Sequence, residues 1–253
     1  MQAVVVEPSA ADRALRRSAV YRFLSVALRP PGEGFTSVIA DAGAHTALRE
    51  ASRAAGEGIT APLQAALSHF ADAAPGTLTD EFDRVFGHQV GHDCPPYEAQ
   101  YTAGEIFQQT QCIADVAGFY RAFGLDVGDE AHERPDHLSL ELEFMHALAY
   151  REAYARVHHG PADVELLTDA QRTFLRDHLA RWVPTFSRLV ARKTDGPYGA
   201  LAALLERWIA ADAEGLGAGP VEEVDLTPSA DTLDLDADAF ACGAGRCPLE
   251  PSA

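Results

Sequence analysis

Apolar side chains recur every three or four residues through most of this chain, and this period restricts the fold more than any other feature. Between Ala11 and Leu28 they form one stripe, with arginines on the other side. Such spacing is typical of an amphipathic helix with one buried face, and prolines and glycines interrupt it at intervals. The sequence lacks the strand–helix alternation of a parallel-sheet protein. We therefore predict an all-α fold.

The interruptions divide the chain into helical segments. Pro62 and Pro135 are expected in the first turn of their helices, where a missing N–H does no harm. Thr79 or the nearby Thr77 is expected to cap a short helix, and Gly124 to end a long one. The expected segments are 11–28, 37–55, 62–74, 80–86, 103–123, 135–157, 164–182 and 198–211.

Charge separates the chain into two parts. The 253 residues carry a net charge of −18, and residues 212–253 contain ten acidic residues and one arginine. We predict a single helical-bundle domain over residues 1–211, followed by a disordered or loosely docked acidic Gly/Pro-rich tail over 212–253. The negative charge argues against binding to nucleic acid or anionic lipid and favours a basic partner.

The N-terminal arginine pair raises the question of export. Arg16 and Arg17 are followed by apolar residues, but Arg22 and Arg29 interrupt the run and Pro30 ends it, unlike a signal peptide. No apolar run approaches the roughly 18 residues of a membrane helix. We therefore expect a cytoplasmic protein with no stable membrane insertion.

Known enzyme motifs are mostly missing, including the Gly-rich phosphate loop and the nucleophile elbow. Two metal hypotheses remain. Glu143-x-x-His146 supplies one of the two such motifs that a di-iron bundle requires. Cys242 and Cys247 lie at the loose end of zinc-ligand spacing, and the alternative is two thiols on a mobile tail. This second hypothesis, which uses cysteine and histidine, also includes His88, His92 and Cys94 in one loop.

Two polar stretches are unusual. Residues 132–145 place seven ionisable side chains around a helix start, where Asp136 is suited either to cap the helix or to receive a cationic ligand. Glu141 follows His137 by four residues and shares its helix face. Residues 95–101 combine two prolines, two tyrosines and an acid, which suits either recognition or a well-packed loop. Both alternatives stay open for each stretch.

At these stretches the sequence resembles the TorD/DmsD/NarJ family of redox-enzyme maturation chaperones, over about residues 11–211. Residues 114–125, the Phe86-Gly87-His88 triplet and the tail cysteines resemble the branch that serves type II enzymes of the DMSO reductase family. The family motifs are matched by Glu81-Phe82-Asp83-Arg84-Val85-Phe86, by Pro96-Tyr97-Glu98, and by Arg134-Pro135-Asp136-His137-Leu138 with the helix after it.

This resemblance implies an all-α, non-enzymatic protein of the cytoplasm that needs no cofactor and acts as monomer or homodimer. Its partners would be the twin-arginine signal peptide and the apo form of a molybdopterin enzyme's catalytic subunit. It would assist cofactor insertion and delay export. The resemblance also implies that Asp136 and His137 line the peptide site. The alternative is a helical metal-binding or redox protein that uses Glu143, His146 and the cysteines.

The residues themselves suit a signal peptide, because an acidic body attracts its basic start and a groove between helices can bury its apolar core. We expect three carboxylates to face the arginines and four rings to line the apolar part, with Arg84 and His137 completing the site. The carboxylates are Asp136, Glu141 and Glu98, and the rings are Tyr97, Tyr101, Phe86 and Phe144.

Overall fold

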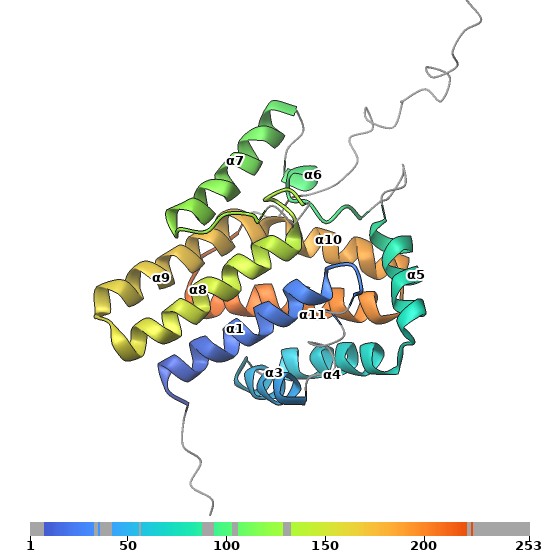
Figure 1. The fold of residues 1–253 in the computed structure, drawn as a ribbon, viewed down its shortest axis with the longest axis horizontal. Coiled ribbons are helices and arrows are strands. Elements are labelled where there is room, and N and C mark those ends of the chain that lie inside the picture. The colour runs from blue at the N-terminus through green and yellow to red at the C-terminus, as the bar shows by residue number, and fades with distance from the viewer. Residues whose placement is uncertain are drawn as a thin grey trace, which may run out of the picture.

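The computed structural model describes residues 8–32, 35, 42–55, 57–87, 94–102, 106–128, 133–221 and 224 (Figure 1). Within them the secondary structure is helical, and the one isolated β-bridge joins Tyr97 to His137. The predicted all-α fold is confirmed. The helices are α1 (Ala10–Ala27), α3 (Ala42–Ala55), α4 (Glu57–Asp72), α5 (Pro75–Phe86), α6 (Ala99–Thr102), α7 (Ile106–Ala122), α8 (Leu138–His158), α9 (Pro161–Phe174), η1 (Leu175–Leu179), α10 (Ala180–Lys193) and α11 (Pro197–Leu216).

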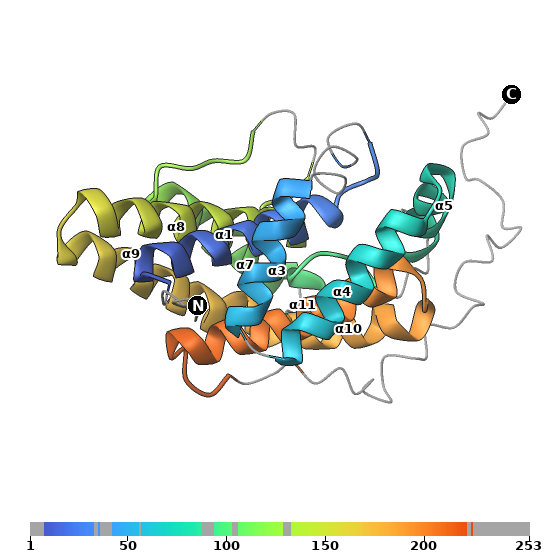
Figure 2. The same cartoon turned by 90° about the horizontal axis from the view of Figure 1, so that it is seen from below.

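Most of the long helices pack side by side, and the short α6 lies against α7 and α10. Helix α8 lies between α1 and α9, while α10 packs on α11 and α11 packs on α4. The connection between α8 and α9 lies at one end of the molecule, and α5 lies at the other end in both views (Figures 1 and 2). None of the described helices combines the length and low charge needed to cross a bilayer.

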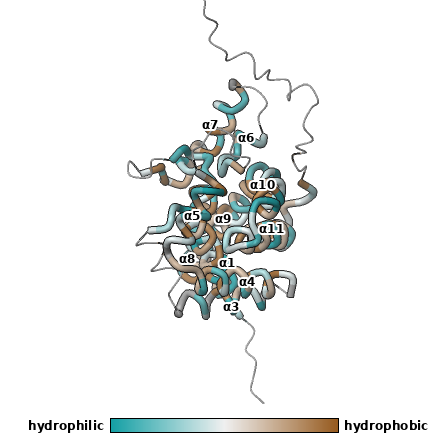
Figure 3. The backbone as a smooth tube through the Cα atoms, turned by 90° about the vertical axis from the view of Figure 1, so that its right-hand side faces the viewer, coloured by the Kyte–Doolittle hydropathy of each residue, from teal (hydrophilic) through white to brown (hydrophobic). Residues whose placement is uncertain are grey.

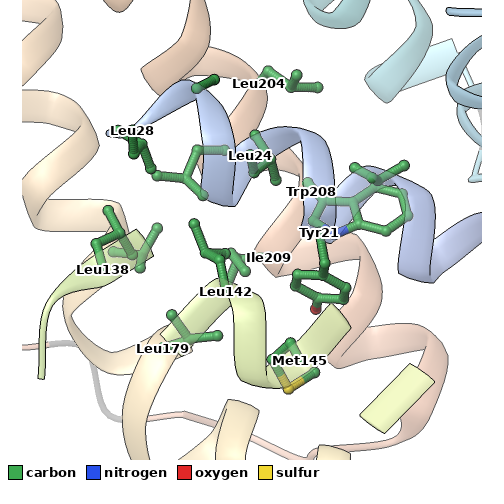
Figure 4. Packing of buried hydrophobic residues seen from close by; sticks show 14 of the residues in the cluster. Tyr21, Leu24, Leu28, Leu138, Leu142, Met145, Leu179, Leu204, Trp208 and Ile209 are labelled. Carbon is green, nitrogen blue, oxygen red and sulfur yellow. The ribbon is translucent and has the colours of Figure 1, made fainter. Parts of the chain in front are cut away.

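The hydrophobic core forms where α1, α8, α10 and α11 meet. Leu24 of α1 and Leu142 of α8 face each other in the close-up, with Leu179 of η1 below Leu142 and Trp208 of α11 beside Tyr21 (Figure 4). Hydrophobic and hydrophilic stretches alternate along the helices (Figure 3), as expected when each helix buries one face. The buried side chains form one continuous cluster, so the helices share a single core.

Prolines mark several helix starts, but not always those that the sequence predicted. Pro62 lies inside α4, which begins earlier at Glu57, whereas Pro75 occupies the first turn of α5 and replaces the expected threonine cap. Pro135 precedes α8, whose N-cap is His137. Gly124 adopts a left-handed conformation with φ 67° just after α7, as predicted for a glycine that ends a helix.

The helix predicted over 164–182 is longer and interrupted. It consists of α9, a π-helical turn over Leu175–Leu179 and α10, which continues through Pro184 to Lys193. Helix α11 reaches Leu216, beyond the expected end at 211. The tail from residue 225 onward, with its cysteine pair, lies outside the described residues.

A buried guanidinium group joins four helices. Arg17 of α1 donates to both carboxylate oxygens of Asp212 on α11, at 2.5 and 2.9 Å, and to Glu152 of α8 at 3.0 Å. It also donates to Gln171 of α9 at 2.7 Å, and Tyr21 donates to Asp212 at 2.6 Å. Burial lowers the pKa of Arg17, but Asp212 and Glu152 raise it above its ordinary value. This corrects two expectations, because the arginines were placed on the side of the helix opposite the apolar stripe and Asp212 in the acidic tail.

Replacement of Arg17 should destabilise the fold severely. We expect Arg17→Met to lower the free energy of unfolding by about 3–5 kcal/mol, because the buried Asp212 loses its cation and Glu152 keeps only Arg156. Arg16→Met is the matched control, since the neighbouring Arg16 pairs with an exposed Glu50 and should cost about 0–1 kcal/mol. Urea unfolding followed by circular dichroism measures both. Equal losses for the two variants would contradict the assigned role of Arg17.

Candidate functional site

Two loops that are far apart in the sequence pair in front of α8. The Glu98 N–H donates to the Asp136 carbonyl at 3.0 Å, and the Leu138 N–H donates to the Pro96 carbonyl at 2.9 Å. These bonds bring the Pro-Tyr-Glu and Asp-His motifs into one unit, which we call the loop clamp (residues 96–98 and 134–138).

Asp136 holds the loop clamp together from inside. Its side chain is closed to solvent, one oxygen accepts the Ala99 N–H at 3.1 Å, and Arg134 binds both oxygens at 2.9 and 3.0 Å. Asp136 therefore stabilises the start of α6 rather than the start of α8. His137 caps α8 instead, because its Nδ1 accepts the Ser139 N–H at 3.2 Å. Burial lowers the pKa of His137.

Two further carboxyl groups lie beneath the clamp. Glu98 faces His178, whose Nδ1 lies 2.9 Å from the nearer carboxylate oxygen. Glu141 accepts a hydrogen bond from Trp182 Nε1 at 3.3 Å. Burial raises the pKa of Glu141 well above its usual range, and the neighbouring Glu98 and Asp136 raise it further. The protonated form of Glu141 is thus favoured inside the protein.

The outer side of the clamp is aromatic and partly charged. The Tyr97 hydroxyl donates to Glu133 at 2.5 Å, and the Arg134 guanidinium carbon lies 4.4 Å from the centre of the Tyr97 ring. The His137 ring meets Tyr97 edge to face at 5.0 Å. Tyr97 is therefore fixed by contacts on three sides and presents its remaining surface beside a carboxylate.

A groove with a volume of about 720 Å³ opens beside the clamp. It lies between α8, the end of α1 and residues 125–128, and His137 and Phe144 of the predicted site line it. Its apolar lining includes Leu125, Val127, Leu140, Ala147 and Tyr150, and its charged lining includes Arg29, Asp126, Glu133, Glu143 and Arg151.

The wall of the groove at residues 125–128 is anchored to the bundle. Arg151 of α8 donates to the Phe123 carbonyl at 2.6 Å, and the Tyr120 hydroxyl donates to the Pro135 carbonyl at 2.8 Å. Phe144 packs against Tyr120 with ring centres 4.9 Å apart. The groove is thus preformed and needs no rearrangement of helices to exist.

The proposed metal ligands on α8 bind protein groups instead. Glu143 pairs with Arg29 at 2.5 Å, and His146 Nδ1 lies 3.0 Å from the carbonyl and 2.8 Å from the hydroxyl of Ser18. Across the described residues, no group of three or more His, Cys, Asp or Glu side chains is arranged to hold a metal ion. The other candidates, His88, His92, Cys242 and Cys247, lie outside the described residues.

The structure separates the predicted site residues into two groups. Asp136, His137, Glu141, Tyr97, Glu98 and Phe144 lie in or against the loop clamp, and Tyr101 stacks on Trp182 behind it with ring centres 5.2 Å apart. The α5 residues lie apart. Arg84 donates to the Lys193 carbonyl at 3.2 Å, and Phe86 stacks on Phe186.

The three carboxylates predicted to face peptide arginines are not on the surface. Asp136, Glu141 and Glu98 are at most 2 % exposed, and the rings of Tyr101, Phe86 and Phe144 are also buried. In this conformation these side chains support the loop clamp and the groove from inside the protein and have little contact with solvent. Peptide binding at this site stays a prediction, and the carboxylates available for contact are Asp126, Glu133 and Glu143.

Sequence reasoning missed four contributors. His178 and Trp182 complete the buried cluster from a π-helical turn and the helix after it, and no local pattern connects them with the motifs. Arg29 and Glu133 reach the groove from a helix end and a loop. Of the four, only Glu133 belonged to the unusual polar stretch, so its charge was the one sequence signal that pointed to the site.

The comparisons with known proteins fit this arrangement. The family model described as nitrate reductase delta subunit matches residues 49–188, which include both halves of the loop clamp. The chain belongs to this family. The predicted resemblance to redox-enzyme maturation chaperones of the NarJ/TorD type is thereby confirmed.

Curated relatives of this chaperone are themselves assembly chaperones rather than enzymes. The perchlorate reductase assembly chaperone of Dechloromonas aromatica (strain RCB) is 29 % identical over 212 residues, which cover 80 % of this chain and 91 % of the relative. The selenate reductase assembly chaperone of Thauera selenatis is 35 % identical over 42 % of this chain and 53 % of its own length. The dimethyl sulfide dehydrogenase assembly chaperone of Rhodovulum sulfidophilum is 28 % identical over 79 % and 81 %.

A solved structure is also similar to this chaperone. It is of a protein assigned as a redox enzyme maturation protein from Archaeoglobus fulgidus, with 18 % identity and a TM-score of 0.47, and the match covers 83 % of this chain and 99 % of that one.

The buried Glu141 should make stability depend on pH. A carboxyl whose pKa is raised on folding stabilises the protein fully below its unfolded value of 4.5, and this contribution is lost as the pH rises through the folded value. Glu141→Gln cannot ionise, so its advantage over the unaltered chain should grow above about pH 4.5 by up to about 1.4 kcal/mol per pH unit.

Urea unfolding at about pH 4.5, 6 and 7.5 tests this dependence. Glu165→Gln is the matched control, because Glu165 is exposed on α9 and should show no such trend. A constant difference between Glu141→Gln and the unaltered chain across this range would show that Glu141 is ionised in the folded state.

Proposed function

We propose that this chain is the assembly chaperone of a molybdenum-containing oxidoreductase, of the group that includes perchlorate, selenate and chlorate reductases and dimethyl sulfide dehydrogenase. In this proposal it acts in the cytoplasm on the apo catalytic subunit. It binds the twin-arginine signal peptide, assists insertion of the cofactor and delays export until insertion is complete. The names of the relatives support the client class.

The groove beside the loop clamp is the observation that carries the peptide part of the proposal. A twin-arginine peptide has a basic start and an apolar core, and the groove offers Asp126, Glu133 and Glu143 next to an apolar lining. The net charge of −18 attracts the basic end during encounter. A peptide can thus satisfy its charges and bury its apolar residues in one place.

Arg29 shows that a guanidinium group fits this site. It lies at the end of α1 and contacts Glu143, and both side chains are about half exposed. An exposed ion pair of this kind contributes only about 0–1 kcal/mol. An arginine of the peptide can therefore replace Arg29 at Glu143 at little cost.

The client is identified by affinity purification of the tagged full chain from its own host, followed by mass spectrometry. We expect one large molybdopterin-type subunit with an uncleaved twin-arginine signal to be enriched. Recovery of bound metal without such a subunit would instead support the alternative of a helical metal-binding protein.

The contribution of Glu143 is measured by calorimetry with the signal peptide of the client found in this way. Glu143→Gln should weaken binding by about 3- to 10-fold, because one charge-assisted hydrogen bond is lost. Glu206→Gln is the matched control, since Glu206 is an exposed carboxylate with an arginine partner away from the groove. An unchanged affinity of the Glu143→Gln variant would remove Glu143 from the site.

A further inference from the structure

The outer face of α8 is apolar where a solvent-facing helix surface is normally charged. Of its side chains, Tyr150, Tyr154 and Val157 are 55 %, 54 % and 65 % exposed. They follow one another at spacings of four and three residues, so they lie on one face of the helix. Half of the large apolar side chains that are exposed within the described residues therefore lie in this short segment; the others are Leu15, Phe107 and Leu166.

The same face continues into the groove. Extending the spacing toward the start of α8 reaches Ala147, Glu143 and Leu140, all of which line the groove, as does Tyr150. We call Leu140, Ala147, Tyr150, Tyr154 and Val157 the α8 strip. It begins inside the groove, beside the carboxylate of Glu143, and leads out of the groove toward the connection with α9.

We propose that the α8 strip holds the apolar core of the client's signal peptide, with the arginine end of the peptide at Glu143 and the end of the core at Val157. This inference rests on the function proposed above and adds to it the direction and extent of the bound peptide. It assigns a peptide contact to three residues that the motifs do not include.

The part of the strip beyond Glu143 has a length that suits such a peptide. From Ala147 to Val157 the helix advances by ten residues, or about 15 Å. The apolar core of a signal peptide has 7–15 residues and would measure roughly 10–23 Å as a helix. A helical core lying along α8 can thus cover the strip from the groove to its end.

The charges fix the direction. Carboxylates gather at the groove end of the strip, at Asp126, Glu133 and Glu143. At the other end the neighbouring rings are histidines, since Tyr154 packs against His158 with ring centres 4.4 Å apart and against His159 at 5.5 Å. The carboxylates near Val157, Glu165 and Asp169, are matched there by Arg156 and Arg172, so a basic peptide start is favoured at the groove end.

A second copy of this chain fits the strip less well. Self-association through the strip would bring together two chains that each carry a net charge of −18. A signal peptide carries the opposite charge at the end where this chain is acidic. Charge complementarity therefore favours the peptide as the occupant.

The test measures the affinity of the full chain for three synthetic peptides based on the client's signal. One peptide is complete, one ends before the apolar core, and one has both arginines replaced by alanine. We expect Tyr150→Ala with Tyr154→Ala to weaken binding of the complete peptide by roughly 30- to 100-fold, from the lost burial of two rings. Binding of the truncated peptide should not change.

Two control variants distinguish the strip from a second groove beneath α7. Phe107→Ala removes an exposed ring from that second groove and should leave the affinity unchanged. Glu143→Gln should weaken binding of the complete and truncated peptides but leave the arginine-free peptide unchanged. A loss caused by Phe107→Ala and not by the tyrosine pair would move the apolar core to the second groove and overturn the inference.

The direction is tested with a photoreactive group on either end of the complete peptide. We expect the arginine end to crosslink near residues 140–143 and the far end near 154–157, as mapped by mass spectrometry. The reverse pattern would overturn the proposed direction. If the unaltered chain does not bind the peptide, the proposed function itself is overturned. If the tyrosine double variant binds the peptide normally but has a changed sedimentation mass, the strip is a dimer interface.

Discussion

A single buried cation organises the helical bundle. Arg17 enters the core from α1 and finds partners on α8, α9 and α11, so four helices are held at one point by charged hydrogen bonds. Burying a charge is costly unless its partners are complete, and without Arg17 the buried carboxylate of Asp212 would lose its cation. The helices must therefore assemble in one relative arrangement. That arrangement sets the spacing between α1 and α8, where the groove opens.

The loop clamp uses the same principle on a smaller scale. Asp136 accepts hydrogen bonds that water would otherwise accept. Its donors are the Arg134 side chain and the Ala99 N–H in the first turn of α6. Because the carboxylate is used internally, the motif that identifies the family is a structural element of the site. The contacts that we propose with a partner therefore fall to more exposed side chains, such as Glu133 and Glu143.

Local signals in the sequence were sufficient for the fold class and for many helix positions. Helix α1 was expected over 11–28 and spans Ala10–Ala27, and Gly124 adopts the left-handed conformation that its position suggested. Contacts between residues far apart along the chain could not be predicted from these local signals. Arg17 finds its partners 135, 154 and 195 residues away, so nothing near it in the sequence shows that it is buried.

The candidate site shows the same limit. The motifs located the loop clamp, but they did not show that Asp136, Glu98 and Glu141 face inward. Glu98 and Glu141 find their partners in His178 and Trp182, which come from another part of the chain. The exposed face of α8 was hidden for a different reason: a helix with both faces apolar looks in sequence like a fully buried helix.

The π-helical turn at Leu175–Leu179 has a consequence for comparing relatives of this protein. A turn with one additional residue rotates everything after it by about 100° around the helix axis. His178 lies within this turn and Trp182 just after it, and both reach the carboxyl groups under the clamp. In a relative without the extra residue, an alignment that matches α9 would assign these two roles to side chains pointing elsewhere. The equivalent residues in such a relative have to be found by superposing the buried cluster and not by counting along the helix.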